Sequence, residues 1–156
     1  MVASREGYDI RIVRGDMAKP LPFADECFDV IFHPVSNCYV EDVLHVWREC
    51  FRMLRRGGVL LAGFDNGISY LFDDSAPLTV VNKLPYNPLK MSQPDYERIA
   101  ASGGGIQFSH SMEEQIGGLL KAGFRLTDFY EDRDREGGAE IGKYTPQYAA
   151  VRAVKE

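Results

Sequence analysis

The segment 43–64 constrains the fold most strongly, because an amphipathic helix is followed there almost at once by an apolar strand. The first half of this segment repeats apolar residues at the 3.6-residue spacing of one helix face. These residues are Val43, Val46, Trp47, Cys50, Phe51 and Leu54. Gly57 and Gly58 are expected to end the helix, and the run 59–64 has the continuous apolar character of a strand buried on both faces. A helix joined so closely to a buried strand indicates an α/β domain.

Four further strands are predicted from β-branched and aromatic content, at 8–13, 28–32, 124–130 and 148–154. The run 28–32 is nearly continuous in apolar residues, so we expect a central strand that is covered on both faces. The last two strands are expected to pair as an antiparallel ribbon. In such a sheet ligands bind at the carboxyl ends of the central strands, so the loops after Val13, Phe32 and Phe64 are of most interest.

A second helix is predicted between Ser111 and Gly123. Ser111 and Glu114 form an S-x-x-E capping pattern, and an apolar helix face follows them. The region 65–108 is instead rich in Asn, Asp, Ser, Gly, Pro and aromatic residues, which indicates an inserted lid or cap within one domain that spans 1–156. We expect most of its aromatic rings to fill a small core of the insertion. Tyr70 and His110 are pocket candidates, because each lies near the end of a strand or a helix.

Charge and composition argue against several classes of partner. The formal net charge is -5 and the isoelectric point is near 5.2, so we expect no nucleic-acid partner. No apolar run approaches the roughly 20 residues that span a bilayer, and the first residues lack the apolar core of a secretory leader. We therefore expect a cytoplasmic protein with no membrane partner. His33, Cys38 and His45 are too irregularly spaced for a zinc site, so no metal is predicted.

Three short sequence blocks follow one another between residues 15 and 60. They are Gly15-Asp16-Met17-Ala18 with Leu21-Pro22-Phe23, then Phe28-Asp29-Val30-Ile31, then Arg52-Met53-Leu54-Arg55-Arg56-Gly57-Gly58-Val59-Leu60. Together they resemble the GDA-x-x-LPF, FDVV and R-x-LKPGG-x-L blocks of class I S-adenosylmethionine-dependent methyltransferases, from about Ile10 to the C-terminus. The resemblance implies a partial, Rossmann-like class I methyltransferase sheet, mostly parallel with an antiparallel C-terminal strand.

The same resemblance implies S-adenosylmethionine as the cofactor, with Asp16, Met17 and His33 as its contacts. A carboxylate at the end of a strand can accept a hydrogen bond from the adenine amine, while the next backbone amide donates to a ring nitrogen. The alternative is that Asp16 is only a turn residue after Gly15. The backbone of His33 is implied to lie near the methionine end of the cofactor.

The loop after 28–32 is implied to face a small-molecule methyl acceptor, which makes Asn37 and Tyr39 substrate-binding candidates beside Tyr70 and His110. Ordinary loop roles are the alternative for His33 and Asn37. Methyl transfer from a sulfonium is an in-line displacement, so the protein mainly aligns the reactants and excludes water. A general base is needed only for some acceptors, and no catalytic residue is assigned.

The glycine-rich loop of this family, E/D-x-G-x-G-x-G, does not occur before Ile10. Its absence removes most of the expected cofactor contacts, so we expect a methyltransferase as the parent protein but a weak or inactive fragment. Exposed strand edges favour a homodimer or a strand-exchanged oligomer. The competing hypothesis is a non-catalytic, self-associating α/β domain that binds no cofactor. A nicotinamide-dependent enzyme has little support, because no G-x-G-x-x-G follows a strand.

Overall fold

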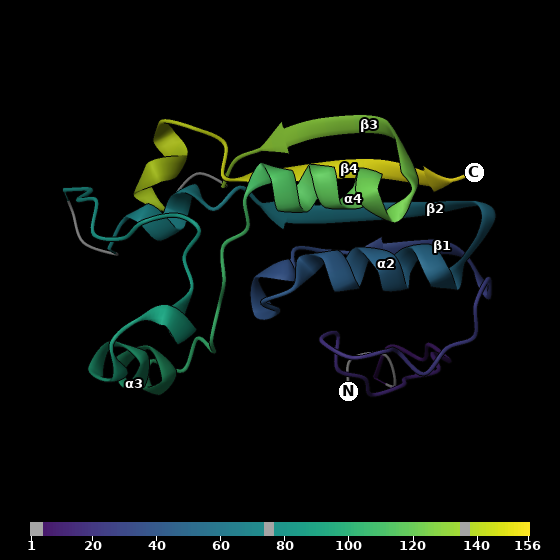
Figure 1. The fold of residues 1–156 in the computed structure, drawn as a ribbon, viewed down its shortest axis with the longest axis horizontal. Helices are drawn as coiled ribbons and strands as arrows, with labels where there is room; N and C mark the ends of the chain where they lie inside the picture. The colour runs from purple at the N-terminus through teal and green to yellow at the C-terminus, as the bar shows by residue number, and fades with distance from the viewer. Residues whose placement is uncertain (1–4, 74–76, 135–137) are drawn as a thin grey trace.

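The computed structural model describes residues 5–73, 77–134 and 138–156. Within these residues four strands form one sheet in the order β1-β2-β4-β3 (Figure 1). β1 is parallel to β2, and β4 is antiparallel to both β2 and β3, so β4 alone runs against the other three. The predicted fold class, a mostly parallel sheet with an antiparallel C-terminal strand, is therefore confirmed. The strands are β1 (Phe28–His33), β2 (Leu54–Asp65), β3 (Phe124–Asp132) and β4 (Tyr148–Lys155).

Helix α2 (Val43–Met53) lies on one face of this sheet, as the sequence periodicity predicts (Figure 1). Its N-terminus is capped by Asp42, whose carboxylate accepts a hydrogen bond from the backbone amide of His45 at 3.1 Å. The core lies between this helix and the sheet. Its most completely buried large side chains include Trp47 from α2 and Leu60 and Phe64 from β2, each with 0% exposure.

The second predicted helix covers the same face beside α2 (Figure 1). It begins as a π-helical turn, Glu113–Gly117, and continues as α4 (Gly118–Ala122). The predicted capping box is present, since Ser111 Oγ accepts from the Glu114 amide at 3.2 Å and Glu114 Oε2 accepts from the Ser111 amide at 2.8 Å. The antiparallel pairing of β3 with β4 confirms the predicted ribbon.

The glycine pair 57–58 has a different role from the predicted one. Helix α2 ends at Met53, and both glycines lie inside β2. Gly57 has a φ of 77°, and a Cβ on Gly58 would lie 2.8 Å from the carbonyl oxygen of Arg55. The register between β1 and β2 shifts nearby, between Phe28 and Val30. The glycines therefore allow an irregular first turn of the strand rather than ending the helix.

Two predictions for the N-terminal part of the chain are wrong. Segment 8–13 is not a strand, and its Ile10 and Ile12 are 59% and 61% exposed. No described strand lies beside this segment to share its backbone hydrogen bonds. β1 is not central either, because it pairs with β2 on one side only. Helices cover only one of its faces, so Val30 and Phe32 are 57% and 72% exposed.

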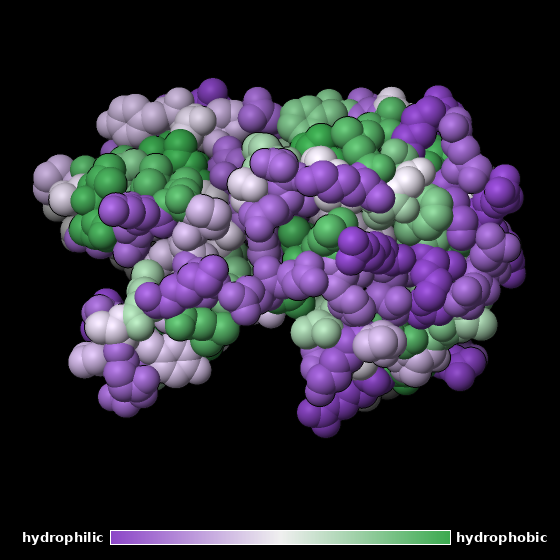
Figure 2. All heavy atoms as spheres, in the orientation of Figure 1, coloured by the Kyte–Doolittle hydropathy of each residue, from purple (hydrophilic) through white to green (hydrophobic). Residues whose placement is uncertain are grey.

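The region 65–108, which the sequence predicts to be an insertion, contains more regular structure than expected. It includes the short 3₁₀ turns η2 (Ile68–Leu71) and η3 (Pro88–Lys90) and the helix α3 (Gln93–Ala101). Its prolines suggested loops throughout, yet Pro94 stands in the first turn of α3, where the missing amide costs nothing. The part that carries α3 projects from the sheet, and Figure 2 shows an open hollow between it and the N-terminal segment.

Candidate functional site

A buried polar network stands at the carboxyl end of β1. The Nδ2 atom of Asn37 donates to Oε1 of Gln115 at 2.7 Å, so Oδ1 of Asn37 faces His33 as an acceptor. His33 therefore donates a hydrogen bond from Nε2 to Asn37 Oδ1 at 2.7 Å. Burial lowers the pKa of His33, although the hydrogen bond with Asn37 acts in the opposite direction. His110 Nε2 donates to the carbonyl oxygen of Asn37 at 3.1 Å. Three predicted site residues thus meet in one network and fix the loop after β1.

Gln115 is the member of this network that sequence reasoning missed. It has 0% exposure and lies in the π-helical turn. Within the described residues its Nε2 atom is buried without a hydrogen-bond partner. Its polar type within an otherwise apolar helix face was the available signal, since buried amides are normally paired.

The loop between His33 and Asn37 is also held in a strained backbone conformation. Val35 has a φ of 36°, in the left-handed region that a β-branched residue rarely adopts. Its backbone amide donates to the carbonyl of Gly63 on β2 at 2.9 Å, which keeps it in place. Such strain persists only where the surroundings impose it, and it concentrates at functional sites.

A cavity of about 700 Å³, which we call the cap cavity, lies between this loop, the end of β2 and the insertion. Tyr39 and Tyr70 both line it, so two predicted substrate residues come together there. The ring of Tyr70 stacks on Tyr86 with centroids 5.1 Å apart, and its hydroxyl donates to Gln107 Oε1 at 2.9 Å. Burial raises the pKa of Tyr70, with nearby Asp65 as the next cause.

Asp65 is the second residue that the sequence interpretation missed. It is the last residue of β2, lines the cap cavity, and its Oδ1 accepts from the Gly67 amide at 3.0 Å. Burial raises its pKa, and the Gly67 amide opposes that shift. The signal was its position, because it directly follows the apolar run 59–64, where a parallel sheet presents its ligand-binding edge.

Asp16 and Met17 do not join this cluster. Asp16 is exposed and lies in a turn, where Oδ1 accepts from the Ala18 amide at 3.0 Å. That hydrogen bond lowers its pKa. Met17 is half-buried and packs against the main core. The assignment of both residues to adenine stays a prediction.

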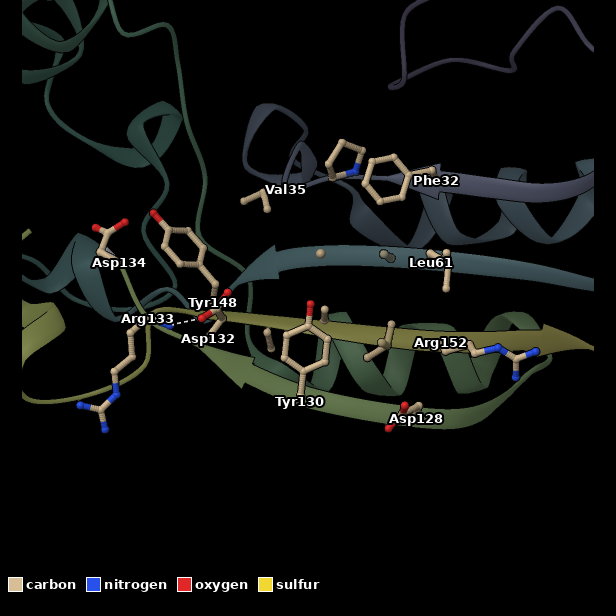
Figure 3. A pocket seen from close by; sticks show the side chains of 16 residues that line it. Phe32, Val35, Leu61, Asp128, Tyr130, Asp132, Arg133, Asp134, Tyr148 and Arg152 are labelled. Carbon is tan, nitrogen blue, oxygen red and sulfur yellow. Dashed lines mark hydrogen bonds between the residues drawn. The ribbon is translucent and has the colours of Figure 1, made fainter. Parts of the chain in front are cut away.

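A second cavity, of about 620 Å³, lies on the sheet face that none of the described helices covers. Figure 3 looks onto this open face, where Phe32, Leu61, Tyr130 and Arg152 lie on four neighbouring strands. Val35 and Tyr148 line both this cavity and the cap cavity. The two cavities therefore adjoin at the carboxyl edge of the sheet.

Neither a metal centre nor a membrane helix is found in the parts of the chain that the structure describes. No group of three or more His, Cys, Asp or Glu side chains there is arranged to hold a metal ion. None of the helices in those parts is both long enough and apolar enough to cross a bilayer.

Sequence comparison relates the chain to known methyltransferases. Residues 1–62 match the model of a methyltransferase domain. The chain is 41% identical over 160 residues to the uncharacterized methyltransferase YbaJ of Bacillus subtilis (strain 168), covering 99% of this chain and 62% of that protein. It is 27% identical over 119 residues to methyltransferase phqN of Penicillium fellutanum, covering 76% and 32% respectively. The chain thus spans less than two thirds of the length of either relative.

The fold also resembles that of a solved methyltransferase structure. The S-adenosylmethionine-dependent methyltransferase from Mesorhizobium loti superposes with a TM-score of 0.66 at 17% identity, covering 92% of this chain and 68% of that one. The described sheet therefore has the fold of this solved structure. Together these comparisons support the predicted class I S-adenosylmethionine-dependent methyltransferase family. The predicted family is confirmed, and S-adenosylmethionine is the cofactor expected for it.

The described residues offer this cofactor one fixed backbone segment. The strained Val35 and the network below it present a fixed backbone segment at the carboxyl end of β1, where a ligand of such a sheet binds. The 156 residues contain no E/D-x-G-x-G-x-G loop, which would bring a second backbone segment close to the cofactor. Residues of the loop 33–37 would therefore hold the methyl-donating end.

Proposed function

We propose that the protein to which this chain belongs transfers a methyl group from S-adenosylmethionine to a small-molecule acceptor, and that it works in the cytoplasm. The observation that carries the proposal is the strained, network-supported loop at the carboxyl end of β1, with the cap cavity beside it. When bound, the cofactor supplies an activated methyl group on a sulfonium.

The chain's own residues would position the acceptor and exclude water. Asn37 and His33 are buried and hydrogen-bonded to each other, so they would keep the loop fixed rather than touch the acceptor with their side chains. Tyr39 and Tyr70 line the cap cavity and would contact the acceptor directly. Preorganised contacts of this kind accelerate a displacement by holding the reacting atoms in line.

We infer that the 156 residues bind the cofactor only weakly, since they lack the glycine-rich loop. Calorimetric titration of the chain with S-adenosylhomocysteine tests this inference. Weak, saturable binding is expected. Asp16→Ala is expected to weaken it about tenfold, which corresponds to about 1.4 kcal/mol. Asp9→Ala, which removes another exposed carboxylate from the same segment, is the matched control and should bind like the wild type.

Equal losses in the Asp16 and Asp9 variants would remove Asp16 from the cofactor site. No binding at all to the wild-type chain would contradict the half-site and favour the second candidate, a non-catalytic domain that self-associates. That alternative is supported by the open edge and apolar face of β1, where Phe32 is 72% exposed.

A separate measurement tests whether the chain self-associates through this surface, as a homodimer or a strand-exchanged oligomer. Light scattering coupled to size exclusion should give a mass above 17.6 kDa for the wild type. Phe32→Lys should return it to the monomer mass, because a charge on the edge strand opposes pairing. Tyr144→Lys, at another ring that is 70% exposed, should leave the mass unchanged. A monomeric wild type would contradict this part of the proposal.

A further inference from the structure

The cap cavity has a single acidic group, and that group has few partners. Among the residues that line the cavity, Asp65 and Arg98 carry the formal charges. The Asp65 carboxylate accepts one hydrogen bond from the Gly67 amide, and no Lys or Arg within the described ranges forms an ion pair with it. A partly buried carboxylate is stabilised when a cation is brought to it.

Aromatic rings form much of the remaining wall. Tyr70 and Tyr86 stack on each other at 5.1 Å with an angle of 23° between their planes. Tyr39 and Tyr148 line the same cavity. The face of an aromatic ring attracts a cation, most strongly where water is excluded. A carboxylate together with tyrosine rings therefore suits a positively charged ligand group.

Arg98 does not cancel this preference. Its side chain is 75% exposed and bonds to Asp95 at 3.4 Å, so its charge is largely screened by solvent and by that carboxylate. The hydroxyl of Tyr70 is occupied as a donor to Gln107. The lining of the cavity thus combines the Asp65 carboxylate with four tyrosine side chains.

We propose that the methyl acceptor is a small-molecule amine, and that Asp65 binds its ammonium group in the cap cavity and removes a proton from it. This inference rests on the proposed function. The N–H bond of the ammonium breaks, an O–H bond forms on the Asp65 carboxylate, and the electron pair stays on nitrogen. The amine nitrogen is then the nucleophile, while a carboxylate acceptor would be repelled by Asp65.

The charged and titratable groups around Asp65 define a pH window for binding. Tyr70, Cys38 and Tyr148 face it from η2, the turn η1 (Asn37–Tyr39) and β4, and His110 faces it from the segment before the π-helical turn. The amine should bind while Asp65 is ionised and the amine is protonated. Binding should therefore fall as the pH drops through the pKa of Asp65, which burial raises, and again above the pKa of the amine.

Titration of the 156-residue chain with benzylamine, and with benzyl alcohol as its neutral counterpart, tests the amine site. Wild-type chain should bind benzylamine at least tenfold more tightly than benzyl alcohol. Asp65→Asn should lose at least tenfold in benzylamine affinity, although it keeps an oxygen for the Gly67 amide. Asp128→Asn is the matched control, because Asp128 also caps a backbone amide but lies on the exposed β3.

Equal affinities for the two probes, or equal losses in the Asp65 and Asp128 variants, would overturn the proposal. The comparison of the two probes on wild-type chain decides the question even where a variant does not fold. S-adenosylhomocysteine is titrated separately, which separates the two claims. Cofactor binding without benzylamine binding removes the amine site alone, whereas benzylamine binding without cofactor binding leaves the amine site and contradicts the cofactor half-site.

Discussion

Arg52 and Glu49 are joined by two hydrogen bonds, 2.8 Å to Oε1 and 2.9 Å to Oε2 of the carboxylate. The same pair binds the segment that precedes β1. Glu49 Oε2 accepts from the Leu21 amide at 2.7 Å, and Arg52 donates to the Phe23 carbonyl at 2.7 Å. Two charged residues on the last turns of α2 therefore attach an otherwise irregular segment to the domain.

Glu49→Gln should destabilise the fold by roughly 1–3 kcal/mol at neutral pH, the usual range for a hydrogen bond to a charged group. The Arg52 guanidinium lowers the Glu49 pKa from 4.5 to about 2. A depressed folded-state pKa gives stability above the unfolded value, so this contribution is lost as pH falls from about 4.5 towards about 2. Urea unfolding at neutral pH and near pH 3 measures both effects. Asp25→Asn, at an exposed Arg52 contact, should change little.

His33 gives a second pH effect at a higher pH. Burial lowers its pKa in the folded chain below the ordinary value of 6.5, whereas the unfolded chain binds a proton near that value. Stability should therefore decrease as pH falls below about 6.5. His33→Gln keeps a donor for Asn37 but does not titrate, so its free energy of unfolding should change less between pH 7 and pH 5.5. If the free energy of unfolding changed equally with pH in the wild type and in His33→Gln, the imidazole of His33 would not be buried and neutral.

Val35→Asn should stabilise the fold by about 1 kcal/mol, because asparagine tolerates a positive φ far better than valine. Little burial is lost, since Val35 is 39% exposed. Val81→Asn is the control, at a valine that is 53% exposed and has no positive φ. Thermal unfolding of the two variants measures the difference. A loss of stability in the Val35 variant equal to that of the Val81 variant would argue against strain.

Two adjacent glycines should respond oppositely to alanine. A Cβ on Gly118 would lie 2.8 Å from Trp47 Cδ1, so Gly118→Ala should cost about 1–3 kcal/mol through overpacking. A Cβ added to Gly117 would lie 3.6 Å from the flexible side chain of Glu113. Gly117→Ala should therefore stabilise the helix, by up to about 1 kcal/mol. Chemical denaturation followed by Trp47 fluorescence compares them, and equal effects would contradict the close contact between α4 and α2.

Local sequence patterns correctly predicted those helices and strands that pack against another element within the described residues. The helix predicted from the spacing between Val43 and Leu54 is present as Val43–Met53, and the capping box at Ser111 and the ribbon of β3 with β4 appear as expected. Strand formation at 8–13 failed because a strand needs a partner for its backbone, which residue type does not reveal. The apolar character of 28–32 similarly gave no information on which faces are covered.

The sequence predicted where in the sheet the candidate site lies better than it predicted which side chains form it. The rule that ligands bind at the carboxyl edge pointed to the loops after Phe32 and Phe64, and the cap cavity lies there. Gln115 and Asp65 were missed because their importance depends on burial and on contacts with residues distant in sequence. Gln115 bonds to Asn37, 78 positions away. Such a pairing leaves no trace in local periodicity.

The place of β4 has a consequence for how the chain acquires its structure during synthesis. β4 lies between β2 and β3 and joins them, although it comes after both in the chain. Until residues 148–155 have left the ribosome, β2 and β3 have no common neighbour, and both expose backbone groups that other chains can capture. The long sequence separation between β2 and β4 also predicts slow closure of the sheet. A nascent chain of this type would therefore depend on chaperones, or on late and rapid insertion of its last described strand, to avoid aggregation.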